Sequence, residues 1–200
     1  MNKERWVHLR DPGEQPGGMD WRHVEMIHSA LMNELPESVV EIGCFWGFST
    51  SAIIEALEQT DKIKRVDLVD CFLTEQLHKS VLEMRMAGRI LAHQMNSLDY
   101  TGKAECWIID GTHGPGAHKD YDLAMKSGRI IVIHDSNPKS GWPQANSGAW
   151  EIAERLKQDA TYWFEDLEKR PGELTERGIL FGFMAMQTGK TALALEALAG

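Results

Sequence analysis

The sequence predicts an α/β protein with a doubly wound, mostly parallel sheet that ends in an antiparallel pair of strands. Three observations lead to this prediction. Short β-rich runs alternate with amphipathic helical stretches at short spacing. One run, Ile130–Ile133, is apolar without interruption, as expected of a central strand buried on both faces. Two more β-rich runs, 162–164 and 179–184, lie near the C-terminus and form the expected pair.

The helices are predicted from apolar periodicity and from residues that favour helix ends. Asp20 is expected to cap a helix over 21–34, whose apolar residues recur at i, i+3 and i+7 until Pro36 stops it. The other helices are expected in a stretch that begins at Ser49 or Thr50, and over about 75–87, 116–126 and 148–158.

The strands are predicted as β-rich runs that end at glycine or polar residues. Before the terminal pair they cover Ser38–Ile42, Ile63–Val69, Ile90–Met95, Cys106–Ile109 and Ile130–Ile133. In an open α/β sheet the ligand binds outside the carboxyl ends of the strands. We therefore expect a ligand site where polar residues gather at these ends, namely at Glu41, Gly43, Asp70, Asn96, Ser97, Asp110 and Asp135.

Length, charge and cysteine content restrict the class of protein. The 200 residues predict one domain over 1–200, with a polar segment over 1–19 that is either an arm or a cover over a site, and an Ala/Leu-rich tail over 187–200. A net charge of −9 disfavours a general nucleic-acid or anionic-membrane surface. No apolar run suits a membrane span or a signal peptide, and three cysteines without a CxxC pair indicate reduced thiols, so we expect a cytoplasmic protein. The Trp-rich ends favour a homodimer.

Two sequence blocks carry the chemistry. The first runs from Glu41 to Thr50 (EIGCFWGFST), and Gly43 and Gly47 in it permit a tight turn and a close approach of backbone to ligand. The glycine spacing is not that of a G-x-G-x-x-G dinucleotide site, and no Lys follows Gly47 as a P-loop requires. The second block runs from Ile108 to Asp135 and includes the segments IIDGTH, KD and GRIIVIHD.

Together the two blocks resemble the class I S-adenosylmethionine (AdoMet)-dependent methyltransferases. The resemblance is closest to small O-methyltransferases of the catechol O-methyltransferase type and to related sugar and natural-product enzymes. It covers about residues 20–186, with Arg129 where the family often has a second glycine and Thr112 where it commonly has an acid. The resemblance implies a Rossmann-like fold and transfer of the methyl group of AdoMet to a small hydroxylated molecule.

The resemblance also implies which residues bind AdoMet. Glu41 would position its amine, and Asp70 would accept hydrogen bonds from the two ribose hydroxyls, for which a carboxylate offers only acceptors. Trp46 would offer an aromatic face to the sulfonium. The implied cofactor set is Glu41, Gly43, Gly47, Ser49 and Thr50 at the methionine part, Asp70 at the ribose, Cys71, Phe72, Asn96 and Ser97 at the adenine, and Asp110.

An oxygen nucleophile must lose its proton, and a phenol with a pKa near about 10 needs a base or a cation for this. His113 follows Asp110 by three residues and occupies the region where the catechol-type enzymes place their base. We therefore expect His113 to be the general base beside Asp110, with His134 as the second choice. The alternative for His113 is a structural hydrogen bond that shapes its loop.

Asp110 and Asp135 follow strands expected to be adjacent, so both carboxylates can reach one divalent ion across about 4.8 Å. Ser136 or Asn137 would add a third oxygen, a donor set that suits Mg²⁺. The alternative to a metal is an Asp–His couple, in which His113 or His134 pairs with a carboxylate and acts as the base.

Other functions remain open at this level. They are N-methylation, methylation of a sugar, an AdoMet-binding module without turnover and, less favoured, a dehydrogenase. Trp142 and Trp150 flank a polar loop, where they either wall a substrate pocket or fill the core. His78 and His118 are expected at the surface.

Overall fold

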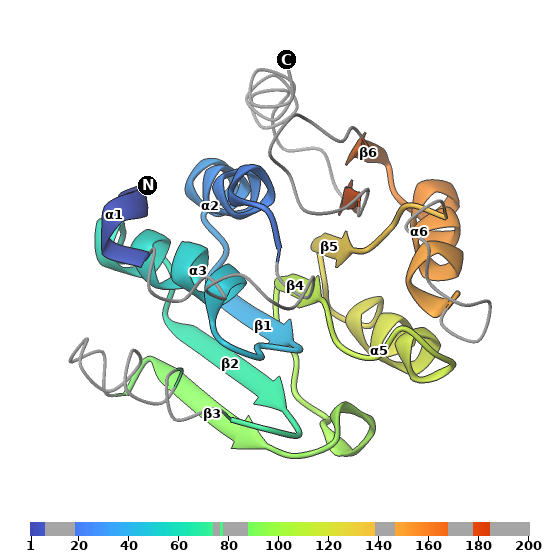
Figure 1. The fold of residues 1–200 in the computed structure, drawn as a ribbon, viewed down its shortest axis with the longest axis horizontal. Coiled ribbons are helices and arrows are strands. Elements are labelled where there is room, and N and C mark those ends of the chain that lie inside the picture. Colours follow the sequence, from blue (N-terminus) through green and yellow to red (C-terminus); the bar gives the residue numbers. More distant parts are fainter. Residues whose placement is uncertain (7–18, 74–76, 78–87, 139–146, 168–177, 185–200) are drawn as a thin grey trace.

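The computed structural model describes residues 1–6, 19–73, 77, 88–138, 147–167 and 178–184. Within these ranges one seven-stranded sheet runs in the order β3-β2-β1-β4-β5-β7-β6 (Figure 1). The first five strands are parallel, whereas β7 is antiparallel to both β5 and β6. The predicted doubly wound sheet with a terminal antiparallel pair is therefore confirmed. Its strands are β1 (Ser38–Ile42), β2 (Arg65–Asp70), β3 (Ile90–Gln94), β4 (Cys106–Ile109), β5 (Ile130–His134), β6 (Tyr162–Asp166) and β7 (Ile179–Phe183).

Helices cover both faces of the sheet (Figure 1). On one face lie α2 (Trp21–Glu34) and α3 (Phe48–Gln59), and on the other lie α5 (Gly116–Ala124) and α6 (Gly148–Asp159). Neighbouring residues of one strand contribute to opposite layers: Val39 packs in the cluster with α2 and α3, and Val40 in the cluster with α5 and α6. Since β1, β4 and β5 are enclosed on both faces, the ends of these strands are where their polar groups can meet a ligand.

Most predicted elements agree with the structure within two residues. The helix predicted from Ser49 or Thr50 begins at Phe48, and the strand predicted from Ile63 begins at Arg65. Asp20 occupies the N-cap position of α2, but its side chain makes no capping hydrogen bond, so that part of the prediction is wrong; its carbonyl accepts from the N–H of Val24 instead. The predicted helix over 75–87 and the tail over 187–200 lie outside the described residues.

The start of the predicted N-terminal arm is a short helix, α1 (Lys3–Trp6), which was not expected. Trp6 is buried, and its indole N–H donates to Glu55 of α3 over 2.9 Å. Glu55 and Glu58 lie toward the C-terminal end of α3, away from the carboxyl ends of the strands, so this part of the arm supports the scaffold. Residues 7–18, the larger part of the predicted cover, lie outside the described ranges.

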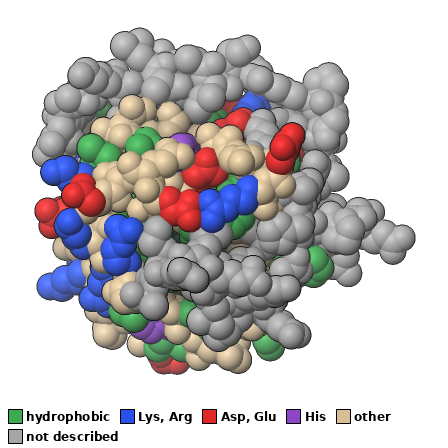
Figure 2. Space-filling model, turned by 90° about the vertical axis from the view of Figure 1, so that its left-hand side faces the viewer, with side chains coloured by type: hydrophobic (Ala, Val, Ile, Leu, Met, Phe, Trp, Pro, Cys, Tyr) green, Lys and Arg blue, Asp and Glu red, His purple; other side chains and the backbone are tan. Residues whose placement is uncertain are grey.

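The face on which α1 meets α3 carries charges of both signs. Figure 2 shows Lys and Arg side chains beside Asp and Glu side chains on this side of the molecule. One such pair is Arg5 with Glu58, which joins α1 to α3 by two hydrogen bonds. In the part of the chain that the structure describes, no helix combines the length and apolar character needed to cross a membrane.

Candidate functional site

A pocket of about 540 Å³ opens at the carboxyl ends of β1, β2, β4 and β5. This is the edge at which the sequence places its polar strand ends, and the volume falls within the range of about 300–1,000 Å³ typical of ligand pockets. Apolar side chains of Ile42, Val69, Met95 and Leu98 form part of its wall. The predicted site residues that line it are Gly43, Asp70, Cys71, Asn96, Ser97, Asp110, His113 and Asp135.

The glycine loop after β1 approaches the end of β4 very closely. Gly43 has a φ of +85°, and a Cβ there would lie 2.2 Å from the carbonyl oxygen of Asp110. Gly47 has a φ of +87°, and a Cβ there would lie 2.7 Å from the Leu77 side chain. At position 43 a side chain is excluded because it would collide with the Asp110 backbone. At position 47 glycine is favoured mainly because of the positive φ. Gly47 does not line the pocket.

Asp70, at the end of β2, is held by two backbone groups. Its Oδ2 accepts from the N–H of Phe45, and its Oδ1 accepts from the N–H of Phe72, both over 2.8 Å. Each carboxylate oxygen has a second acceptor site, so the same carboxylate can still receive hydroxyls from a ligand. Two oxygens fixed side by side at the rim of a pocket suit a vicinal diol.

Glu41, Ser49 and Thr50 form a buried group behind the pocket. Both hydroxyls donate to the carboxylate of Glu41, Thr50 over 2.6 Å, and all three side chains are almost fully buried. Burial raises the pKa of Glu41 to about 7, although the two hydroxyl donors act in the opposite direction. In this structure the group joins the end of β1 to the first turn of α3, and none of its members lines the pocket.

The residues predicted at the adenine lie on the β2 and β3 side of the pocket. The Asn96 side chain caps a short 3₁₀ helix, η2 (Ser97–Asp99), and accepts from the N–H of Leu98. Ser97 donates to Asp120, whose burial raises its pKa to about 6. Cys71 is exposed at the rim. Phe72 is 76% exposed and, like Trp46, is not among the lining residues.

Two His–Asp pairs lie at the acidic end of the pocket, where Asp110, His113 and Asp135 line it, whereas His134 is buried behind them and does not line it. Nε2 of His113, in the loop after β4, lies 2.5 Å from Oδ2 of Asp135. Nδ1 of His134, the last residue of β5, lies 3.0 Å from Oδ1 of Asp110 and 3.6 Å from Oδ1 of Asp135. Asp135 has a φ of +57°, an uncommon backbone conformation for a residue other than glycine that often marks a functional site. The sequence predicted one Asp–His couple, with either His113 or His134 as its histidine, and in the structure each of the two histidines contacts a carboxylate.

His23, on α2, was not singled out from the sequence. Its Nδ1 lies 3.3 Å from Nε2 of His134, and both rings are buried. The periodicity of α2 offered one signal, since His23 lies four residues before Ile27 and so shares its core-facing side. A histidine on a core-facing side needs a polar partner, and His134, which is 111 residues later in the sequence, is such a partner.

The arrangement also fits a divalent cation. One ligand atom each from Asp110, His134 and Asp135 lie within 4.8 Å of one another. Ser136 and Asn137, expected to supply a third oxygen, lie instead against Gly178 at the start of β7 and do not line the pocket. The third candidate ligand in this structure is therefore a nitrogen of His134.

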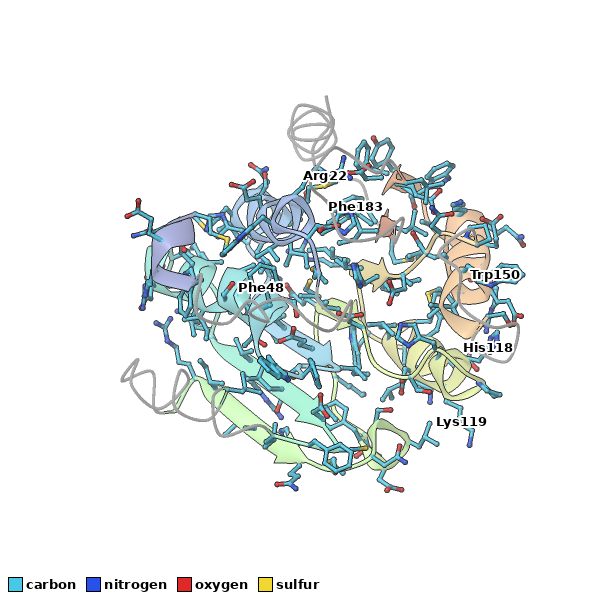
Figure 3. All side chains as sticks on the ribbon, viewed as in Figure 1. Arg22, Phe48, His118, Lys119, Trp150 and Phe183 are labelled. Atoms are coloured by element: carbon cyan, nitrogen blue, oxygen red, sulfur yellow. The ribbon has the colours of Figure 1, made fainter. Side chains whose placement is uncertain are left out.

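Other residues considered from the sequence lie away from the pocket. His118 is about one-third exposed and pairs with Glu151 over 2.9 Å. Figure 3 labels Trp150 on α6, and Trp150 does not line the pocket. Trp142 and His78 lie outside the described residues.

Solved methyltransferase structures resemble this chain over most of its length. TomG from Streptomyces achromogenes, an O-methyltransferase of tomaymycin synthesis solved with SAM (AdoMet), is 15% identical; the match covers 92% of this chain and 100% of that chain with a TM-score of 0.67. The Bacillus cereus O-methyltransferase in complex with SAH is 11% identical, with coverages of 92% and 96% and a TM-score of 0.66. Podospora anserina PaMTH1, a SAH-bound methyltransferase, is 12% identical, with coverages of 90% and 85% and a TM-score of 0.61. This chain therefore has the fold of these methyltransferases.

Comparisons of sequence alone add nothing to this result. No family model matches the chain, and no curated protein sequence matches it.

Proposed function

We propose that this protein is an AdoMet-dependent methyltransferase that transfers a methyl group to an oxygen of a small hydroxylated molecule. One observation carries the proposal: a carboxylate suited to a ribose diol, Asp70, and a paired base, His113, open on the same pocket at the carboxyl edge of the sheet. The fold shared with SAM- and SAH-bound methyltransferases supports the same function.

The cofactor would extend from the glycine loop to η2. Asp70 would receive the two ribose hydroxyls, since both its oxygens are already oriented by backbone N–H groups. Met95 and Leu98 would offer apolar surface to the adenine, with Cys71 at the rim. Glu41 would act on the methionine part from behind the loop, and a cationic amine nearby would favour its ionised form.

His113 would act as the general base. Its Nε2 holds Asp135, so the proton of the acceptor hydroxyl would go to Nδ1, and the Asp135 carboxylate would stabilise the resulting imidazolium. The acceptor oxygen could then attack the methyl carbon in line with the departing thioether sulfur, and the sulfonium would become the neutral thioether of the product. Holding the two reactants in this line can itself supply up to roughly 7–11 kcal/mol of the barrier reduction.

A divalent cation would be held by Asp110 and Asp135, which both line the pocket and offer ligand atoms within 4.8 Å of each other. Such an ion would lower the pKa of an acceptor hydroxyl that it binds. The His113–Asp135 pair is compatible with this, because a ligating carboxylate is commonly held by a hydrogen bond at its other oxygen.

Calorimetry with AdoMet and with its demethylated product tests the first half of the proposal. We expect both to bind, and an absence of binding at millimolar concentration would contradict it. A methyl-transfer screen over a library of hydroxylated and amino compounds tests the second half. Transfer to amines alone would replace O-methylation by N-methylation, and AdoMet binding without transfer to any compound would indicate a binding module.

A further inference from the structure

The cation site proposed above has a donor set that differs from the one expected of a magnesium site. Mg²⁺ prefers oxygen ligands and keeps much of its own water, usually on one or two carboxylates. Here two carboxylates meet an imidazole nitrogen, and neither Ser136 nor Asn137, the oxygen donors expected after Asp135, lines the pocket. Imidazole favours first-row transition-metal ions over Mg²⁺.

The His134 ring is held in an orientation suited to a metal ligand. Nδ1 faces both carboxylates, at 3.0 Å from Asp110 and 3.6 Å from Asp135. Nε2, on the far side of the ring, contacts Nδ1 of His23 over 3.3 Å. If His134 donates its Nε2 proton to His23, the lone pair of Nδ1 points toward the two carboxylates. Metal-binding histidines commonly use their second nitrogen in this way, and such a contact sets both the tautomer and the ring orientation.

Asp135 is held in the same manner. Its Oδ2 is engaged by His113, while its Oδ1 is the oxygen nearer to His134. Two of the three candidate ligands therefore have a second contact that fixes them, and both are almost fully buried. This arrangement is more specific than a surface cluster of acids, because helix α2, strand β5 and the loop after β4 must all be in place to build it.

We propose that Asp110, His134 and Asp135 bind a first-row transition-metal ion in preference to Mg²⁺, with His134 as a ligand through Nδ1 and His23 as the residue that positions it. The inference deepens the proposed function, since the ion would lie where the acceptor hydroxyl is expected. Its test does not need AdoMet, a substrate or turnover.

The test is cation binding to the metal-free, full-length protein by calorimetry, with Mg²⁺, Mn²⁺, Co²⁺ and Zn²⁺ titrated separately. We expect Co²⁺ and Zn²⁺ to bind at least about 100-fold more tightly than Mg²⁺, following the order of affinity for nitrogen-containing sites. Pulsed electron paramagnetic resonance of the Mn²⁺-loaded protein should detect coupling to a histidine ¹⁴N nucleus. Mg²⁺ binding as tight as that of Co²⁺, or an absence of ¹⁴N coupling, would overturn the inference.

Variants separate this site from adventitious binding by other histidines. His134→Gln should remove the ¹⁴N coupling and the tight binding, and His134→Glu should shift the preference toward Mg²⁺. His23→Phe should weaken Co²⁺ binding by about 10- to 100-fold, the effect usual for losing such a supporting contact. His118→Gln is the matched control on α5 and should leave binding unchanged. Tight binding that survives His134→Gln would be adventitious and would overturn the inference.

The same samples distinguish the two proposals. If the cation binds as described but AdoMet does not, the proposed function fails and the metal site stands. If AdoMet binds and no cation does, the metal site fails and the His113–Asp135 couple remains as the base. Because buried substitutions at His134 can impair folding, circular dichroism melts accompany each variant, and the wild-type ¹⁴N measurement stands without them.

Discussion

The N–H of Phe45 donates a 2.8 Å hydrogen bond to Oδ2 of Asp70, so the end of β2 holds the glycine loop that follows β1. This contact fixes the loop through a side chain of the protein itself. The same carboxylate that holds the loop faces the pocket, which makes Asp70 both a structural residue and a candidate ligand of the ribose.

Replacing Asp70 by alanine should weaken AdoMet binding by about 1.5–3 kcal/mol, the value of a hydrogen bond to a charged group. This corresponds to roughly a 10- to 150-fold rise in Kd, measured by calorimetry. Asp70→Asn keeps one acceptor oxygen and should lose less. Asp61→Ala, an exposed acid that precedes β2 at the opposite edge of the sheet, makes the same change of charge and should have no effect. Equal losses in Asp70→Ala and Asp61→Ala would exclude a specific contact.

The three glycines at positions 43, 47 and 88 should differ in their sensitivity to alanine. All have positive φ, but a Cβ at Gly88 would meet nothing within 4 Å, one at Gly47 would meet a Leu77 methyl group, and one at Gly43 would meet the Asp110 backbone. Gly88→Ala should therefore cost only the backbone strain of its positive φ, about 1–3 kcal/mol. Gly47→Ala should cost somewhat more, and Gly43→Ala should exceed about 4 kcal/mol, since the Asp110 backbone just after β4 is held by its N–H, which donates to the Ile42 carbonyl.

Urea denaturation of the three variants measures this order of stability. A Gly43→Ala protein as stable as Gly88→Ala would show that the β1 and β4 ends are farther apart than described here. Gly47→Val extends the test to function, because its side chain should collide with Leu77 and distort the glycine loop, which should abolish AdoMet binding while a cooperative transition persists. Unchanged affinity in that variant would mean that the loop does not contact the cofactor.

Glu41 should make the free energy of unfolding depend on pH. Burial raises its pKa in the folded protein to about 7, above its ordinary value of 4.5. A raised pKa means that the folded state binds the proton more tightly, so the contribution is complete below pH 4.5 and is lost as the pH rises through 7. The shift corresponds to roughly 3 kcal/mol.

The variant Glu41→Gln isolates this contribution, because it cannot ionise and still occupies the space beside Ser49 and Thr50. The stability difference, wild type minus variant, should fall as the pH is raised from 4.5 to 8, as measured by urea denaturation at each pH. Other groups, such as Asp120, titrate in both proteins and cancel in the difference. A difference that is constant over this range would rule out the buried, raised-pKa state of Glu41.

His113→Asn should lower kcat by about 10²- to 10⁴-fold once an acceptor is known, because the general base is lost. The affinity for AdoMet, measured by calorimetry, should stay the same, since the proposed role concerns the acceptor. His118→Asn removes a histidine whose only contacts described here are with α6, and its kcat should match the wild type. A His113→Asn enzyme with normal kcat would reduce His113 to the structural role of holding Asp135.

Much of the fold and the position of the pocket could be predicted from local patterns. The uninterrupted apolar run of β5 predicted a strand that is buried on both faces. The polar residues at the ends of β2, β4 and β5 were expected at one edge of the sheet, because the carboxyl ends of parallel strands lie at the same edge. These inferences depend on each residue's own neighbours in sequence and on rules that hold for every open α/β sheet. For that reason Asp70, Asp110, His113 and Asp135 were expected at one site before their distances were known.

The sequence by itself thus determined the class of fold and which side chains stand at the carboxyl edge, whereas only the tertiary structure decided which atoms meet there. His113, in the loop after β4, pairs with Asp135, which follows β5, and His134, at the end of β5, pairs with Asp110. Ser49 and Thr50 turn toward Glu41, away from the pocket. His23 reaches His134 from a helix 111 residues earlier. Such pairings depend on strand order and on how each helix packs across the sheet, and these are long-range properties that local periodicity does not contain.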